Sequence, residues 1–160
     1  EKDTAGILHD RLAKVGAQAL ITCLPKIAAG TIQSIEQQGK NATYAAKITR
    51  SERWLDWTRP AVELVRQIRA FNPRPLARTV LGDQIILVQQ AALGPVHHNE
   101  HPGSVIQARD ELIRVQTGDG SLELCEVQLP GGRPLGSRDF LNGFPLTPGQ
   151  RFQSANYAQS

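Results

Sequence analysis

Methionine is absent from this sequence, and cysteine is rare: only Cys23 and Cys125 occur. Two isolated thiols exclude a cysteine-rich zinc site and a disulfide framework, because both need several cysteines at short spacings. We therefore expect two reduced, packed cysteines in a cytoplasmic protein. The first residue, Glu1, is not a methionine, so we expect the N-terminus to result from processing or excision of a longer chain.

Long hydrophobic runs are also absent. No apolar stretch approaches the roughly 20 residues that a membrane-spanning helix needs, so we expect no membrane contact. With 40% hydrophobic and 21% charged residues, the composition is that of a globular protein and argues against disorder. A chain of 160 residues can form one domain, or a small domain plus part of another.

Positive charge is modest overall, with a formal net charge of +3, but it is unevenly placed. Between residues 50 and 78 there are seven arginines and three acidic residues, a net charge of +4. Between residues 79 and 160 there are five arginines and eight acidic residues, a net charge of −3. A block of this kind favours a polyanionic partner, because each neutralised phosphate releases condensed counterions.

Two amphipathic helices are predicted. Over residues 4–24 apolar residues recur at three- and four-residue steps, Asp3 or Thr4 can cap the first turn, Pro25 should kink or restart the helix, and Gly30 should stop it. A polar linker follows.

The second helix should run over residues 59–71, with Thr58 as its cap, Pro60 in its first turn and Asn72-Pro73 at its end. Its predicted buried stripe consists of Ala61, Leu64, Val65, Ile68 and Phe71, with Arg59 and Arg66 on the opposite face and Arg69 on the flank.

After residue 75 the pattern changes to short strands separated by turns. Residues 76–81 and 84–93 flank a Gly82-Asp83 turn, which indicates a hairpin. Further strands are predicted at 104–108, 112–117, 121–127 and 149–152, with a short helix at 137–141. The fold class is therefore predicted as α+β, with a small antiparallel β-barrel of the oligonucleotide-binding type, a helix before it and a detached N-terminal helix.

Four stretches in order resemble the C-terminal half of the methionyl-tRNA formyltransferase family: Asp3-Thr4-Ala5-Gly6, Thr43-Tyr44-Ala45-Ala46-Lys47-Ile48, Leu55-Asp56-Trp57 and Ile68-Arg69-Ala70-Phe71-Asn72-Pro73-Arg74-Pro75. The Thr117–Gly120 turn and the Ser137–Leu141 helix follow in the family's order, so the resemblance covers about residues 3–152. The chain departs from the family's pattern at Trp54-Leu55, where the family usually has Arg-Ile, and at Arg74, where it has an aromatic residue.

The resemblance implies an organisation and a function. Residues 1–35 would hold the last helix of a truncated Rossmann-like catalytic domain, 36–57 a linker, 58–152 the barrel and 153–160 a tail. The family transfers a formyl group from 10-formyltetrahydrofolate to methionyl initiator tRNA in translation initiation. Its catalytic residues lie in the missing domain. We therefore expect an inactive, cytoplasmic, monomeric fragment that binds initiator tRNA but no cofactor and no metal.

The predicted tRNA contacts are the basic residues of the linker and of the second helix with its flanks: Lys47, Arg50, Arg53, Arg59, Arg66, Arg69, Arg74 and Arg78. The alternative interpretation is a solvated surface on which these arginines pair with Glu52, Asp56 and Glu63, since such pairs need no function. Seven arginines against three acids favour the phosphate-facing interpretation.

Other residues leave alternatives open. His97, His98 and His101 could hold a metal, but the surrounding prolines and glycines indicate an ordinary loop. Tyr44 and Trp54 could stack on bases, whereas Trp57 is expected to anchor the linker to the core. Two rival functions remain: the equivalent part of a sugar-nucleotide formyltransferase, and a free-standing nucleic-acid-binding module.

Overall fold

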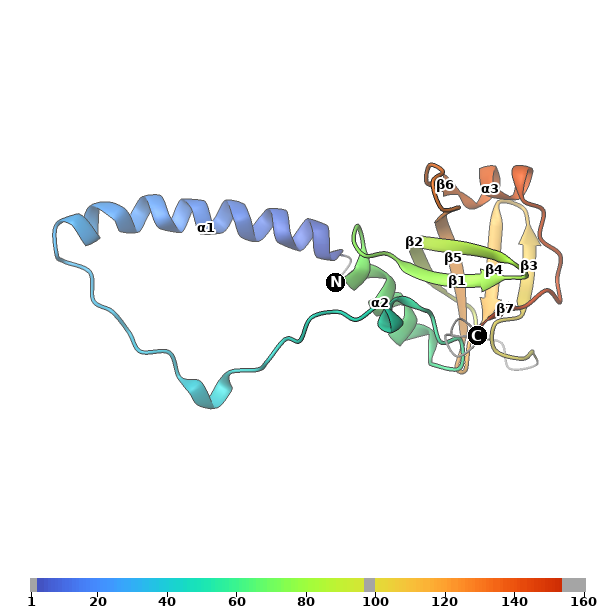
Figure 1. Cartoon of the computed structure of the whole chain (residues 1–160), viewed down its shortest axis with the longest axis horizontal. Helices are drawn as coiled ribbons and strands as arrows, with labels where there is room; N and C mark the ends of the chain where they lie inside the picture. Colours follow the sequence, from blue (N-terminus) through green and yellow to red (C-terminus); the bar gives the residue numbers. More distant parts are fainter. Residues whose placement is uncertain (1–2, 97–99, 154–160) are drawn as a thin grey trace.

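The computed structural model describes residues 3–96 and 100–153 of the chain. It has three parts: a long N-terminal helix, an extended linker that returns beside it, and a compact body in which a curled antiparallel sheet packs with two shorter helices (Figure 1). The fold is α+β, as predicted. In the described part of the chain no helix combines the length and the apolar character needed to cross a bilayer.

Helix α1, Ala5–Ala28, begins at Thr4, whose hydroxyl oxygen accepts a hydrogen bond from the Ile7 amide at 3.3 Å. It was predicted to end at residue 24, but it continues through Pro25. Proline removes one hydrogen bond from a helix, and this loss is tolerated here because the helix surface is open to solvent. After the helix Gly30 takes a positive φ of 66°, the conformation that favours glycine at a helix end.

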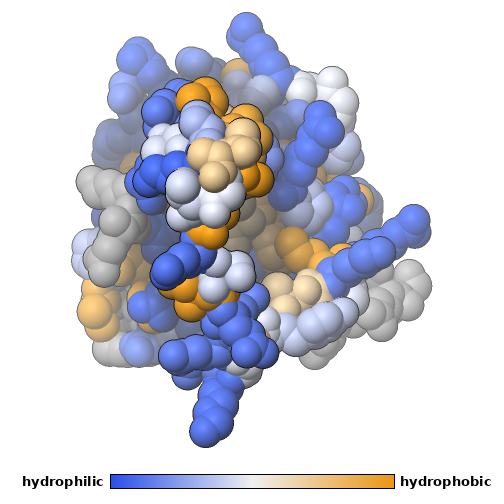
Figure 2. All heavy atoms as spheres, turned by 90° about the vertical axis from the view of Figure 1, so that its left-hand side faces the viewer, coloured by the Kyte–Doolittle hydropathy of each residue, from blue (hydrophilic) through white to orange (hydrophobic). Residues whose placement is uncertain are grey.

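No residue of α1 is buried, although the helix carries a predicted apolar stripe. The larger side chains of this stripe are about half-exposed, for example Leu12 and Val15 at 59% each. Figure 2, which looks at the molecule from the end where α1 lies, shows apolar surface on this helix. At its start α1 contacts the body: the Gly6 amide donates a hydrogen bond to the Asn72 carbonyl at 3.1 Å, and a side chain at position 6 would meet Pro73.

The linker has little regular structure, as predicted. It contains two short 3-10 turns, η1 at Gly39–Asn41 and η2 at Ser51–Arg53, and no strand. Its last residues belong to the body, because Leu55 and Trp57 are completely buried in the core. The indole nitrogen of Trp57 donates a hydrogen bond to Thr79 Oγ1 at 2.9 Å, and the ring stacks on Phe152 with centroids 5.5 Å apart. The expectation that Trp57 is an anchor is confirmed.

Helix α2, Ala61–Phe71, begins later than predicted, and Thr58 does not cap it. The Thr58 hydroxyl instead donates to Asp56 Oδ1 at 2.7 Å, because the aspartate forms a local turn with the residues that follow it. The first helical amide, of Ala61, donates to the Asp119 carbonyl of the sheet at 2.9 Å. The predicted stripe faces the core: Ala61, Leu64, Ile68 and Phe71 are buried, and Val65 packs against them.

The sheet contains β1 (Ala77–Leu81), β2 (Gln84–Gly94), β3 (Val105–Arg109), β4 (Leu112–Gln116), β5 (Ser121–Gln128), β6 (Leu135–Gly136) and β7 (Phe152–Gln153). The strand order is β3-β4-β5-β2-β1-β7, with β6 beside β5, and all pairs are antiparallel. The predicted two-residue turn at Gly82-Asp83 joins β1 to β2. The turn between β3 and β4 uses positive φ at Asp110 and Glu111, which suits a tight hairpin.

Backbone hydrogen bonds join the two ends of this strand order. The Val105 amide donates to the Gln150 carbonyl at 2.8 Å, and the Phe152 amide donates to the Gly103 carbonyl at 2.8 Å. The sheet therefore curls until the start of β3 meets the segment before β7. Helix α3, Ser137–Gly143, packs over one end, and Phe140 enters the core. Both cysteines are free, but Cys125 is exposed on β5, so the expectation that both are packed is wrong.

Candidate nucleic-acid interface

The linker ends in a turn that brings its basic residues to the body. Glu52 folds back on Thr49, accepting hydrogen bonds from its amide at 2.6 Å and its hydroxyl at 2.7 Å. Both bonds lower the pKa of Glu52 below its ordinary value, and the bond from the Thr49 amide has the larger effect. The turn is tied to α2 because Gln67 Nε2 donates to the carbonyls of Glu52 at 2.8 Å and Trp54 at 3.2 Å.

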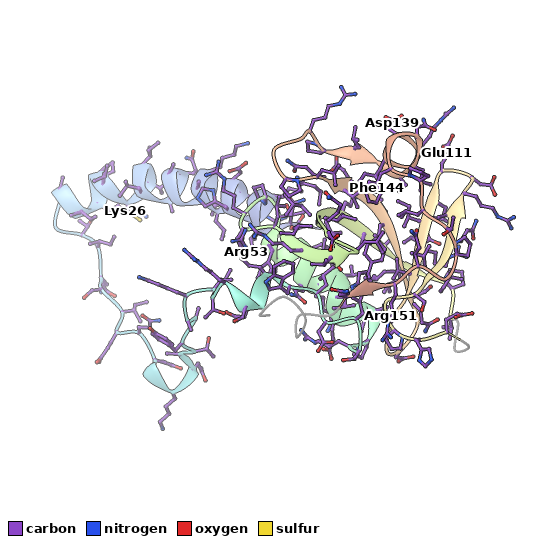
Figure 3. All side chains as sticks on the ribbon, turned by 45° about the vertical axis from the view of Figure 1, so that its right-hand side comes forward. Lys26, Arg53, Glu111, Asp139, Phe144 and Arg151 are labelled. Atoms are coloured by element: carbon purple, nitrogen blue, oxygen red, sulfur yellow. The ribbon has the colours of Figure 1, made fainter. Side chains whose placement is uncertain are left out.

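Arg53 and Arg78 lie together where the linker meets the sheet. Residue 54 forms a parallel bridge with Arg78, and the Leu55 amide donates to the Arg78 carbonyl at 2.8 Å. Arg53 Nη2 donates to the Pro75 carbonyl at 2.8 Å. Figure 3 labels Arg53 at this junction. Burial lowers the pKa of Arg78, and the nearby charge of Arg53 lowers it further.

Arg66 and Arg69 lie on α2 beside a hollow between this helix and the start of α1. The hollow has a volume of about 770 Å³, and Leu8 and Val62 contribute to its apolar wall. Arg66 is exposed, whereas Arg69 is half-buried and also borders an adjoining hollow against β2. The basic face of α2 therefore adjoins an apolar recess.

The other predicted contact residues are more peripheral. Arg59 lies just before α2 and pairs with Glu63, with a shortest distance of 2.7 Å, and both side chains are exposed by nearly half. Lys47 and Arg50 are exposed in the linker, and Arg74 is exposed in the turn after α2. Within residues 3–96 and 100–153, the side chains of Lys47, Arg50, Arg66 and Arg74 form no hydrogen bond or ion pair.

Among the described residues, no carboxylate pairs with Arg50, Arg66 or Arg74. Of the three acids that the alternative interpretation uses, only Glu63 pairs with an arginine. Glu52 accepts from Thr49, and Asp56 accepts from the Thr58 amide and hydroxyl. An exposed pair such as Arg59–Glu63 contributes at most about 1 kcal/mol. Most of the positive charge therefore remains available to an anion.

The remaining candidate residues, three histidines and two aromatic residues, differ in their exposure. His97 and His98 lie outside the described residues, and His101 is exposed. No group of three potential metal ligands occurs where the structure describes the chain. Tyr44 is 94% exposed in the linker, whereas Trp54 is half-buried beside Arg78. Tyr44 is therefore the aromatic residue most open to a partner.

Two features of the interface were not predicted from the sequence. One is the hydrogen bonding of Gln67 to the linker turn, which has no sequence signal because a glutamine on a helix is ordinary. The other is the hollow between α1 and α2. The start of α1 approaches the end of α2 closely at Gly6 and Pro73, and a glycine in the first turn of a helix was a signal that could have indicated this approach.

Comparison with known proteins shows what this chain is similar to. Residues 47–145 match the family described as formyl transferase, C-terminal domain. The chain is 45% identical over 150 residues to a methionyl-tRNA formyltransferase of Nitrosococcus oceani, covering 92% of this chain and 46% of the relative. It is 42% identical over 154 residues to that of Paraburkholderia phymatum, covering 96% and 47%. The chain thus spans about half the length of these curated relatives.

Solved structures of HypX from Aquifex aeolicus share the fold. A variant of that protein superposes with a TM-score of 0.66 at 20% identity, over 89% of this chain and 26% of HypX. A second HypX structure, in complex with tetrahydrofolic acid, gives a TM-score of 0.61 over 79% of this chain and 22% of HypX. At 20–21% identity these matches concern the fold alone.

Proposed function

The chain belongs to the formyl transferase C-terminal domain family, and from this premise we propose that it is the tRNA-binding portion of a methionyl-tRNA formyltransferase. The whole protein would transfer a formyl group from 10-formyltetrahydrofolate to the amine of methionyl initiator tRNA, in translation initiation in the cytoplasm. The relatives, which are methionyl-tRNA formyltransferases, support the reaction and the tRNA. The tetrahydrofolic acid complex of HypX, which has the same fold, is consistent with a folate cosubstrate.

The observation that carries the tRNA-binding role is a set of exposed cations, Lys47, Arg50, Arg66 and Arg74, whose side chains form no ion pair within residues 3–96 and 100–153. Among the described residues around the interface, Glu63 is the one acid of the block that pairs with an arginine. Cations on the linker and α2 then remain available for phosphates, and each phosphate contact adds to affinity through counterion release. Phosphate contacts position an RNA without selecting its sequence, so this surface would hold the tRNA rather than identify it.

The division of the chain follows from the same proposal. Residues 1–35 carry the last helix of a Rossmann-like catalytic domain, residues 36–57 link it to the body, and residues 58–152 form a barrel of the oligonucleotide-binding type. The exposed apolar stripe of α1 supports the first assignment, because a helix with such a stripe normally packs against further protein. The joined ends of the sheet support the barrel.

The chemistry would then lie outside this chain. Formyl transfer needs a positioned proton acceptor and a donor for the developing oxyanion. We propose that the chain is a monomer, binds neither cofactor nor metal, and has no transferase activity by itself. Mixing it with 10-formyltetrahydrofolate and methionyl initiator tRNA should give no formylmethionine; turnover would contradict this assignment.

A binding titration tests the tRNA role directly. The 160-residue chain should bind initiator tRNA at low salt, measured by fluorescence anisotropy, and the affinity should fall steeply as the salt concentration rises. Arg66→Ala and Arg50→Ala should each weaken binding severalfold, because both side chains are exposed and free of carboxylates. Arg133→Ala, in the loop between β5 and β6, is the matched control. Absence of binding at low salt would reject the proposal.

A further inference from the structure

Arg53 and Arg78 differ from the other basic residues because they lie close enough for the charge of Arg53 to lower the pKa of Arg78, in addition to the larger effect of burial. Both side chains are half-buried, and the Nε atom of each is buried without a hydrogen-bond partner. Arg53 keeps one bond, from Nη2 to the Pro75 carbonyl. For Arg78, no side-chain hydrogen bond or ion pair occurs in the part of the chain that the structure describes.

Within residues 3–96 and 100–153, no carboxylate pairs with Arg53 or Arg78. The nearest acids in sequence to Arg53 are Glu52 and Asp56, and both accept hydrogen bonds from threonines instead. Buried or half-buried cations are ordinarily paired, because removing a charge from water is unfavourable without a counterion. The pair is therefore a local excess of positive charge that an anion would relieve.

The fold holds the two arginines together firmly. Arg53 is fixed by the turn that Gln67 ties to α2, and Arg78 is fixed in β1, which pairs with β2 over its whole length. The Leu55–Arg78 backbone bond joins the two segments. A ligand that bridges both guanidinium groups would therefore meet two backbone segments already held together, and an Arg53 side chain already positioned by its bond to Pro75.

We propose that Arg53 and Arg78 together bind one phosphate group of an RNA backbone, at the junction of the linker and the sheet. The identification of RNA as the source of the phosphate rests on the proposed function; the anion site itself does not. Guanidinium groups suit phosphate oxygens because their planar donors match the geometry of the anion.

The first test uses inorganic phosphate and the 160-residue chain. Millimolar phosphate should raise the melting temperature of the wild type and of Arg133→Gln above that in chloride at equal ionic strength, since a ligand of the native state stabilises it. Arg78→Gln should lose this increase, and Arg78→Lys, which keeps the charge, should keep part of it. Without phosphate, Arg78→Gln should melt at the wild-type temperature or higher, because it removes repulsion and breaks no side-chain bond.

A structural arginine would behave in the opposite way. If Arg78→Gln melts at a lower temperature without phosphate and still responds to phosphate, Arg78 supports the fold and the proposed site is overturned. An equal phosphate response in the wild type and Arg78→Gln, whatever the melting temperature, also overturns it.

The second test uses initiator tRNA. Arg78→Gln should weaken binding severalfold at low salt and reduce the slope of log affinity against log salt by about 1, whereas Arg133→Gln should change neither. If Arg78→Gln matches Arg133→Gln while both bind tRNA, the phosphate site is overturned and the proposed function stands. If the wild type binds no tRNA but phosphate stabilises it in an Arg78-dependent way, the anion site stands and the proposed function fails.

Discussion

The indole nitrogen of Trp57 donates a hydrogen bond to Thr79 Oγ1, 2.9 Å away, and both side chains are completely buried. The Thr79 hydroxyl in turn donates to the Gln153 carbonyl at 3.3 Å. Three segments far apart in the sequence are thereby joined: the end of the linker, β1 and β7. This relationship places the basic linker turn against the sheet, so the core and the candidate interface depend on the same residues.

Thr79→Val should lower the free energy of unfolding by about 1 kcal/mol, because the change keeps the shape but removes a buried hydroxyl that both accepts and donates. Chemical denaturation of the wild type and the variant measures the difference. Thr79→Ser is the matched control, since it keeps the hydroxyl and loses only a methyl group. A larger loss in Thr79→Ser than in Thr79→Val would show that packing, and not the hydrogen bond, is the important contribution.

Gly118→Ala should destabilise the body by about 3 kcal/mol or more, because the new Cβ would lie 1.7 Å from the Thr58 carbonyl oxygen and the backbone there must move. The Gly118 amide also donates to the Trp57 and Arg59 carbonyls, at 2.8 and 3.1 Å, so the shift would disturb the start of α2. Gly16→Ala, in the exposed middle of α1 with nothing within 4 Å, should be neutral or stabilising. Similar denaturation midpoints for both variants would contradict this prediction.

The turn formed by Thr49 and Glu52 should become less stable at acidic pH. Two hydrogen bonds from Thr49 lower the pKa of Glu52 in the folded chain, and the bond from its amide lowers it more than the bond from its hydroxyl. A lowered pKa stabilises the turn above the ordinary glutamate pKa, and this contribution disappears as the pH falls through the lowered value. Thr49→Val should move the Glu52 pKa part of the way back upward in an NMR titration. Thr58→Val is the control, and an equal Glu52 pKa in the two variants would refute the assignment.

The exposed stripe of α1 should become buried in a chain as long as the curated relatives. In such a chain Leu12→Ala should cost about 2–5 kcal/mol, the usual range for a buried leucine. In the 160-residue chain, where Leu12 is 59% exposed, it should change stability by no more than about 0.5 kcal/mol. Lys14→Ala, on the same exposed helix, should have little effect in either chain. Equal effects of Leu12→Ala in both chains would remove the case for a catalytic domain against α1.

Local signals predicted the elements of this fold well. The Thr4 cap, the buried stripe of α2 and the Gly82-Asp83 hairpin depend on residues a few positions apart, so they can be inferred from the sequence. The errors arose where distant residues decide the structure. The first amide of α2 bonds to Asp119 instead of Thr58, and α1 continues through Pro25, whose side chain is exposed.

The candidate interface also combines features that the sequence indicates with features that only the fold creates. The positive block and its lack of matching acids are properties of composition, and the sequence indicates them. The pairing of Arg53 with Arg78 depends on a parallel bridge between residue 54 and β1, which no local pattern announces. The role of Gln67 is equally invisible, because only the fold brings the linker turn to α2.

The seam that joins the ends of the sheet has a consequence for protein synthesis. The strand edge at residues 103–105 stays unpaired until residues 149–152 have been synthesised, and one edge of β1 stays unpaired until β7 has been synthesised. At about 5–20 residues per second, a ribosome needs several seconds to extend the chain from Arg78 to Phe152. During that interval the arginine block has already been made while two strand edges are open to association with other chains. A nascent chain of this family member is therefore most exposed to misassembly just before its last strand emerges.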